Sequence, residues 1–228
     1  MRNDLVELVF VFDRSGSMTS IYQTAVAGFK EYIQSQLGVP GDCTLSLYTF
    51  DNTSEKVLDR VSLKDTLTQS LIAENTALWF RPRGSTALFD TVARAIRETG
   101  EKLAATPEHL RPGKVILVTI TDGYENCSTF TSRDALRSMI EHQQGVYKWD
   151  FVFIGANQDA VLTAQGLGIR AEAALTYLAN DASADAMMRT LGNYTSSARY
   201  ACAKGVDINA AFSAEERSAV LDAGQSST

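Results

Sequence analysis

Apolar runs with strand character alternate along this chain with patterns typical of helices. Residues 8–12 are continuously apolar, which favours a strand that is covered on both faces. The other segments with strand character are 44–50, 56–63, 115–120, 151–154 and 174–178. The segment 56–63 follows a tight polar turn at Asp51 and Asn52, so we expect it to pair antiparallel with the strand before it.

The helical segments carry an apolar residue at every third or fourth position. They cover 21–37, 67–71, 86–103, 131–144, 159–166 and 183–203, and a last short helix begins after Ser213. Thr131 with Asp134, and Ser213 with Glu216, have the spacing of capping boxes. The order of elements predicts an α/β fold. We expect a Rossmann-like three-layer sandwich with a mostly parallel central sheet, one antiparallel edge strand and helices on both faces.

Composition excludes several classes of partner. The 228 residues carry a formal net charge of −6, and no basic domain or stripe is present. This balance argues against binding to nucleic acid or to an anionic membrane. No apolar run approaches the length of a membrane span, no signal peptide is visible, and the three cysteines lack CxxC spacing. We therefore expect a cytoplasmic protein with unpaired thiols.

Polar turns follow two of the predicted parallel strands, and a third polar turn opens a helix. Asp13, Ser15 and Ser17 come after the first strand, Asp122 comes after the strand at 115–120, and Thr86 opens the helix at 86–103. Ligands of open α/β sheets bind at the carboxyl ends of the strands, so these residues can meet at one edge. Two carboxylates and three hydroxyls, without histidine or thiol, suit a hard cation such as Mg²⁺.

Further charged and aromatic residues flank these turns. Arg14, Arg81 and Arg83 would favour an acidic ligand at the mouth of the site, or would be ordinary solvated charges. Tyr124 and Glu125 follow Asp122 and can shape the specificity of the mouth, or Glu125 can simply face solvent.

The enzyme classes that share parts of this pattern lack essential residues here. The histidines, His109 and His142, fall outside the strand-end turns, and no GxSxG, GxGxxG or GxxxxGK[ST] motif occurs. A haloacid-dehalogenase-like phosphotransferase needs a second aspartate where this chain has Ser15. We therefore expect a binding module with no catalytic residues. A Mg²⁺-dependent phosphohydrolase-like enzyme on a Rossmann-like fold is the alternative.

The motifs together resemble those of the von Willebrand factor type A domain. The segment Phe12 to Met18 is similar to the family's DxSxS signature, Gly84 to Asp90 to its threonine loop, and Thr121 to Gly123 to its third loop. The resemblance covers roughly residues 5–205, so we take residues 1–205 as the domain. Residues 206–228 would form an appended C-terminal helix and a disordered tail beginning at Gly224.

The resemblance implies an intact metal-ion-dependent adhesion site on Asp13, Ser15, Ser17, Thr86 and Asp122. In the family the hydroxyls bind Mg²⁺ directly, the aspartates often act through water, and Mn²⁺ or Ca²⁺ can replace Mg²⁺. The implied ligand is an Asp or Glu side chain, or a C-terminal carboxylate, of a partner protein. The absence of a signal points to a bacterial or bacteriophage cytosolic member. Such members serve as subunits of larger assemblies, some of them linked to AAA+ ATPases or to stress and phage systems. In some members ligand binding moves the last helix, here 183–203.

Overall fold

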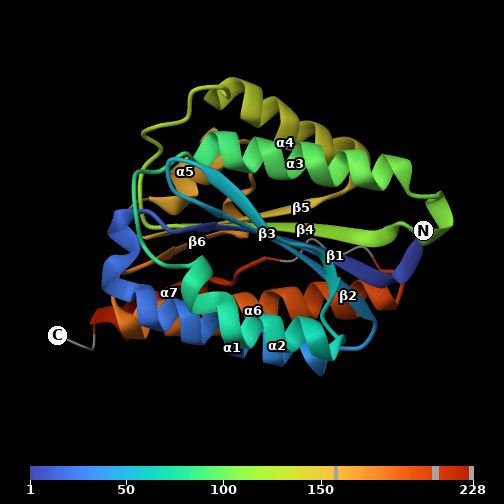
Figure 1. The fold of residues 1–228 in the computed structure, drawn as a ribbon, viewed down its shortest axis with the longest axis horizontal. Coiled ribbons are helices and arrows are strands. Elements are labelled where there is room, and N and C mark those ends of the chain that lie inside the picture. Colours follow the sequence, from blue (N-terminus) through green and yellow to red (C-terminus); the bar gives the residue numbers. More distant parts are fainter. Residues whose placement is uncertain (157–158, 207–210, 226–228) are drawn as a thin grey trace.

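The computed structural model, which describes residues 1–156, 159–206 and 211–225, contains one six-stranded sheet in the order β3-β2-β1-β4-β5-β6 (Figure 1). Its strands are β1 (Arg2–Asp13), β2 (Asp42–Phe50), β3 (Ser54–Ser62), β4 (Pro112–Thr121), β5 (Asp150–Ala156) and β6 (Ala174–Tyr177). All neighbouring strands are parallel except β2 and β3, which pair antiparallel at one edge. The predicted fold class is therefore confirmed.

Helices cover both faces of this sheet. They are α1 (Tyr22–Leu37), α2 (Thr66–Trp79), α3 (Leu88–Ala105), α4 (Arg133–Tyr147), α5 (Ala160–Gly166), α6 (Asp181–Ala203) and α7 (Ala214–Gln225), with 3₁₀ turns η1 (Gly16–Ile21), η2 (Glu108–Leu110) and η3 (Ala171–Ala173). Figure 1 shows α3, α4 and α5 on one face and α1, α2, α6 and α7 on the other. The last helix, α7, packs on α6 and β6.

The central strand β1 supplies both hydrophobic cores. Its side chains alternate in direction, so Phe10 and Phe12 enter the core on the side of α1 and α6, whereas Val9 and Val11 enter the core beneath α3. All four side chains are fully buried. The Phe12 ring stacks on Phe80 with a centroid separation of 3.8 Å, which fixes the end of the strand where Asp13 follows.

Several element boundaries differ from the sequence prediction. Helix α2 runs through 66–79 rather than 67–71, and Leu67 and Leu78 are largely exposed, so its apolar residues do not mark a single buried face. Ser132, not Thr131, caps α4 through a bond from Ala135 N. Helix α7 continues through Gln225, so Gly224 does not begin a disordered tail, and positions 226–228 lie outside the described residues.

The predicted cap of the last helix is confirmed. Ser213 N donates to the Glu216 carboxylate over 2.8 Å, and Glu216 N donates to Ser213 Oγ over 3.1 Å. These two reciprocal bonds satisfy donors that a helix N-terminus would otherwise leave unpaired.

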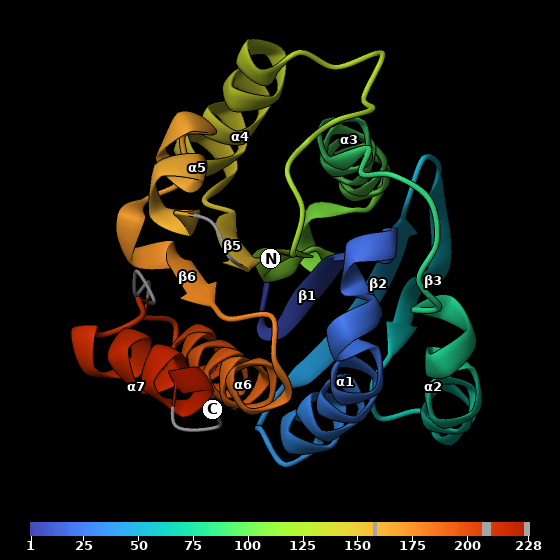
Figure 2. The ribbon, with the colours of Figure 1, turned by 90° about the vertical axis from the view of Figure 1, so that its left-hand side faces the viewer.

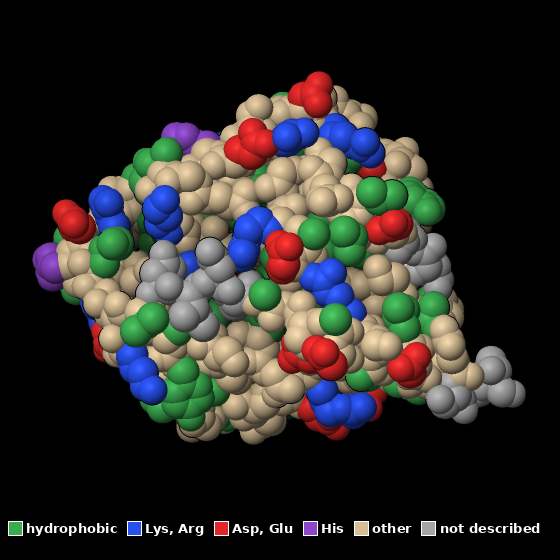
Figure 3. Space-filling model, turned by 180° about the vertical axis from the view of Figure 1, so that it is seen from behind, with side chains coloured by type: hydrophobic (Ala, Val, Ile, Leu, Met, Phe, Trp, Pro, Cys, Tyr) green, Lys and Arg blue, Asp and Glu red, His purple; other side chains and the backbone are tan. Residues whose placement is uncertain are grey.

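The surface carries charges of both signs. Figure 3 shows lysine and arginine side chains interspersed with acidic ones over the back of the molecule. Such mixing gives no electrostatic footprint for nucleic acid on this face. Among the described residues, no helix has the length and apolar character needed to cross a bilayer.

A buried arginine fastens α6 to the end of α1. Arg199 is 2% exposed, and its Nη1 donates to Gln36 O over 2.7 Å and to Gln36 Oε1 over 3.2 Å. Its Nη2 reaches Val39 O and Gly41 O at 3.3 and 3.4 Å. Carbonyl and amide oxygens, instead of a carboxylate, thus accept from both Nη atoms, while Nε has no partner among the described residues. These bonds join α6 to the turn between α1 and β2.

Replacement of Arg199 by leucine should lower the free energy of unfolding by roughly 3–5 kcal/mol, because it leaves several buried acceptors unsatisfied. Urea denaturation would measure the loss. The matched control is Arg189→Leu, on the same helix, because the Arg189 side chain is 63% exposed and pairs with Asp185 on the surface. Its expected effect is below about 1 kcal/mol. Equal losses in the two variants would contradict the stabilising role of the buried Arg199 contacts.

Candidate metal centre

The loops that follow β1, precede α3 and follow β4 lie at the carboxyl edge of the sheet, which faces the viewer in Figure 2. The first strand ends at Asp13, a fully buried carboxylate. Its Oδ1 accepts a hydrogen bond from Ser15 N at 2.7 Å, and its Oδ2 accepts one from Thr121 Oγ1 at 2.5 Å. Burial raises the pKa of Asp13 to about 6, against these hydrogen bonds.

The hydroxyls form a chain that leads to the second carboxylate. Ser15 Oγ lies 2.9 Å from Ser17 Oγ, and Ser17 Oγ donates to Asp122 Oδ1 over 2.5 Å. Burial also raises the pKa of Asp122. A Cβ placed on Gly123 would come within 3.0 Å of Thr86 Oγ1 and 3.5 Å of Ser17 Oγ, so the Thr86 hydroxyl closes the group. The structure therefore brings together all five residues that the sequence singled out.

This group of oxygens suits a cation. Two carboxylates whose pKa values are both raised by burial lie in one site, and a positive ion between them would offset the cost of their charges. The described residues contain no cluster of three His, Cys, Asp or Glu side chains with metal-binding geometry. Any ion held here therefore depends on hydroxyl oxygens as well, which is typical of hard cations.

Sequence reasoning missed two residues beside this group. Thr121 holds the Asp13 carboxylate, as described above. Tyr177, the last residue of β6, is fully buried, and its hydroxyl has no hydrogen-bond partner among the residues that the structure describes. Burial raises the pKa of Tyr177, and the charges of Asp122 and Asp13 raise it further. In the sequence, its place at the end of a parallel strand, and so at the same edge of the sheet as Asp13, could have indicated this position.

A close backbone approach fixes the threonine loop against the first loop. Gly16 N donates to Gly84 O over 3.1 Å, and Gly84 has φ of 71°, which a residue with a side chain rarely adopts. A Cβ there would also clash with the side chain of Asn52. Ala87 N donates to Asp51 O over 2.9 Å, so the β2–β3 hairpin supports this loop from behind.

The prediction that Arg14 projects at the mouth is wrong. Arg14 is 3% exposed, and its guanidinium donates to Asp51 over 3.0 Å and to Glu55 over 2.9 Å. Arg83 is half-exposed and donates to the same two carboxylates, at 2.6 and 3.0 Å. Hydrogen bonds from Arg14 hold the pKa of Glu55 below its usual value. Both guanidiniums therefore hold the hairpin, the first loop and the segment before Thr86 together.

The third loop is fixed to the start of α3. Glu125 does not extend into solvent, because its carboxylate accepts from Phe89 N, Cys127 N and Ser128 N at 2.6–2.9 Å. In the other direction, the carboxylate of Asp90 in α3 accepts hydrogen bonds from the backbone N–H groups of residues 129–131, which follow the third loop. Tyr124, in contrast, is 67% exposed. Of the four predicted mouth residues, Tyr124 and Arg83 remain accessible.

The fold is that of von Willebrand factor type A domains, as comparison with solved structures shows. Proximal thread matrix protein 1 from the mussel byssus is 16% identical with a TM-score of 0.59, over 87% of this chain and 46% of that one. A structure of the same protein described as having a zinc-occupied MIDAS motif (its metal-ion-dependent adhesion site) is 17% identical with a TM-score of 0.57, over 86% of this chain and 46% of that one.

A von Willebrand factor type A protein from Catenulispora acidiphila is 18% identical with a TM-score of 0.56, over 83% of this chain and 42% of that one. This chain thus spans less than half the length of these three structures. No family model matches the sequence, and no curated protein matches it. The likeness at this identity concerns the fold.

Asp13→Asn should abolish Mg²⁺ binding and stabilise the metal-free protein. The substitution removes a buried charge, and the rise in the pKa of Asp13 to about 6 sets the gain at no more than about 3 kcal/mol at neutral pH. Thr121 Oγ1 lies 3.1 Å from Gly123 O, so its proton keeps an acceptor. Calorimetric titration with Mg²⁺ and thermal unfolding in EDTA would measure the two effects. An unchanged Mg²⁺ Kd in the folded variant would refute the site assignment.

Asp51 is not one of the five proposed ligands, yet Asp51→Asn should weaken Mg²⁺ binding. The substitution removes the carboxylate that pairs with Arg14 and Arg83, so the β2–β3 hairpin no longer holds the first loop and the threonine loop in place. The loss of a charged acceptor should cost roughly 1–3 kcal/mol of folding stability. Asp59→Asn, in the same hairpin, is the control: Asp59 is half-exposed and pairs with Lys56 and Lys102 on the surface. Calorimetry and urea denaturation of both variants should show little change in the control. Equal Mg²⁺ affinity in both would contradict this supporting role.

Proposed function

We propose that this protein binds an acidic group of a partner protein through one Mg²⁺ ion held by Asp13, Ser15, Ser17, Thr86 and Asp122. The observation that carries the proposal is the convergence of these oxygen-bearing side chains from three loops on one edge of the sheet. A fold neighbour whose MIDAS motif is described as occupied by zinc supports divalent metal binding at such an edge.

The five residues differ in burial, so the site is accessible to solvent from one side. Ser15 and Thr86 are buried at 2% exposure, whereas Ser17 is exposed and Asp122 is half-buried. A ligand can therefore approach the ion on the side of Ser17 and Asp122. Hydroxyls are weak donors, so they leave the ion electrophilic, and a partner carboxylate is a suitable oxygen ligand to complete its shell.

The preference for an acid comes from the ion itself in this proposal. Arg14 is buried and Arg83 is paired with Asp51 and Glu55, so neither supplies free positive charge at the mouth. The ligand is an Asp or Glu side chain or a C-terminal carboxylate. Hard oxygen ligands suit Mg²⁺, and Mn²⁺ or Ca²⁺ can take its place at the same oxygens.

We assign the protein to the cytoplasm of a bacterium or bacteriophage-infected cell, as a subunit or adaptor of a larger assembly. An assembly with an AAA+ ATPase, or a stress or phage system, fits a compact interaction domain. These assignments rest on the resemblance of the three loops to those of the family.

A binding role fits the site better than hydrolysis does. His142 lies near the end of α4 and His109 lies in η2, which leads into the start of β4, so both are at the opposite edge of the sheet. Neither can act as a general base at Asp13. A metal-dependent phosphohydrolase remains the second hypothesis, and turnover of a generic phosphoester that requires Mg²⁺ and Asp13 would favour it.

Ser17→Ala should abolish Mg²⁺-dependent capture of the partner, whereas Ser20→Ala should leave it intact. Both serines are exposed in η1, but only Ser17 contacts Asp122 and Ser15. The measurement is an affinity pull-down from the host with Mg²⁺ or EDTA, using wild type and both variants. Partner binding that survives EDTA and Ser17→Ala alike would show that recognition uses another surface.

A further inference from the structure

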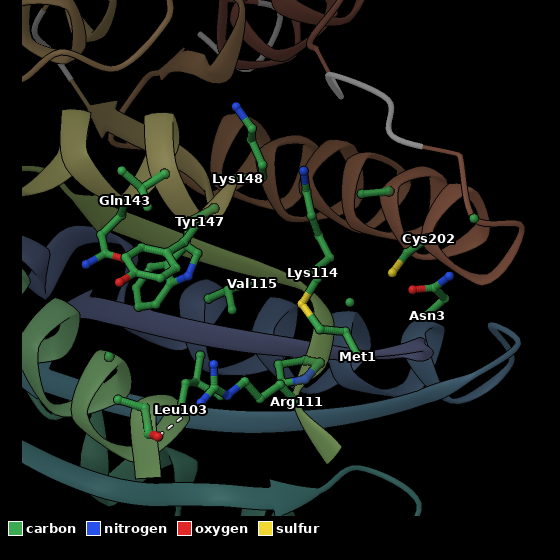
Figure 4. A pocket seen from close by; sticks show the side chains of 18 of the residues that line it. Met1, Asn3, Leu103, Arg111, Lys114, Val115, Gln143, Tyr147, Lys148 and Cys202 are labelled. Atoms are coloured by element: carbon green, nitrogen blue, oxygen red, sulfur yellow. Dashed lines mark hydrogen bonds between the residues drawn. The ribbon is translucent and has the colours of Figure 1, made fainter. Parts of the chain in front are cut away.

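A second cavity lies at the amino edge of the sheet, opposite the metal centre. Its volume is about 590 Å³, within the usual range for small-molecule pockets. Figure 4 shows Gln143 and Tyr147 of α4, Leu103 of α3, and Cys202 of α6 around it, with Met1 between them. The floor comes from the first residues of β4, and none of the metal-centre residues takes part.

The charge of the lining is one-sided. Arg111, Lys114, Lys148 and His142 line the cavity, and no Asp or Glu is among the described residues that do so. This is unexpected in a chain with a formal net charge of −6. Lys114 pairs with Asp150 over 2.9 Å, so the argument for a ligand does not depend on it.

Arg111 and Lys148 also donate hydrogen bonds to carbonyl oxygens at helix C-termini, which neutralise only part of their positive charge. Arg111 donates to Thr106 O over 2.7 Å and to Ala104 O over 3.1 Å, at the end of α3. Lys148 Nζ donates to Gly145 O over 2.9 Å, at the end of α4. A helix C-terminus carries about half a negative charge, so it offsets only part of each full positive charge at the cavity wall.

A glycine keeps the cavity open. Gly100 lies inside α3, where glycine costs about 1 kcal/mol relative to alanine. A Cβ at this position would meet only Gln143 Nε2, at 4.0 Å, so helix packing does not require glycine. Larger side chains here would instead extend into the cavity that Gly100 lines.

Apolar and aromatic side chains complete the wall. Leu103, Val115 and Trp149 contribute buried or half-buried surface, and Tyr147 contributes a ring that is 59% exposed. Such a wall can cover the body of a small organic molecule.

We infer that this cavity binds a small organic anion, with one carboxylate or phosphate group on an apolar, ring-sized body. The anionic group lies in the field of Arg111 and Lys148, and the body packs against Leu103, Tyr147 and Trp149. A concave site with low-dielectric walls strengthens that attraction relative to open solvent.

The test uses three probes that share one apolar body: 4-phenylbutyrate, 4-phenylbutan-1-ol and 4-phenylbutylamine. Calorimetric or NMR titration of the full chain should give the tightest binding for the anion, about tenfold weaker binding for the alcohol, and none for the amine. Lys148 has φ of 58°, which asparagine tolerates, so Lys148→Asn should lower phenylbutyrate affinity about threefold without unfolding the protein.

Gly100→Phe should fill the cavity and abolish phenylbutyrate binding. Gly145→Ala is its control, because Gly145 lies in α4, does not line the cavity, and has open space around an added Cβ. Circular dichroism checks that each variant folds. Equal affinity for the three probes, no binding of phenylbutyrate at millimolar concentration, or undiminished binding in both Gly100→Phe and Lys148→Asn would overturn the inference. If Gly100→Phe fails to fold, the probe series and Lys148→Asn still decide it.

Discussion

Asp13 and Arg14, two buried side chains of opposite charge, are adjacent at the end of the central strand β1. The loops around the candidate metal centre supply the groups that each of them contacts. A buried charge is costly unless it is paired. Arg14 obtains Asp51 and Glu55 from the β2–β3 hairpin, and this pairing also holds the segment that leads to Thr86. Within the described ranges Asp13 accepts hydrogen bonds from Ser15 and Thr121 but pairs with no positive side chain, so a cation could balance its charge.

The sequence predicted the fold and the central group because both depend on local patterns. Continuous apolar runs such as 8–12 identify buried strands, and polar residues directly after them identify the ligand edge. The surroundings of the site depend on distant pairs instead. Arg14 meets Asp51 and Glu55 across 37 and 41 residues, so its neighbours in the sequence indicated a solvent-facing role that the fold does not allow. The position of Glu125 was missed for the same reason, because its partner Phe89 lies 36 residues away at the start of α3.

The two edges of the sheet differ in the charge of the side chains that gather there. At the carboxyl edge, acids and hydroxyls gather around Asp13 and Asp122. At the amino edge, the lining of the cavity is cationic and aromatic, and both histidines lie there. Helices that follow a parallel strand, such as α1 and α4, run antiparallel to it, so their positive ends face the first edge and their negative ends face the second. At both edges, charged side chains therefore sit among helix ends of the opposite sign.

The buried contacts of Arg199 bear on how a ligand at the metal centre could be sensed elsewhere in the molecule. A slide of α6 by one helical turn, about 5.4 Å, would remove its guanidinium from Gln36, Val39 and Gly41 together. With a cost of about 4 kcal/mol, the displaced conformation would make up roughly one molecule in a thousand at equilibrium. A carboxylate would have to bind that conformation about a thousandfold more tightly to make it half of the population. The contacts of Arg199 would therefore set the free-energy cost of any slide of α6 along α1.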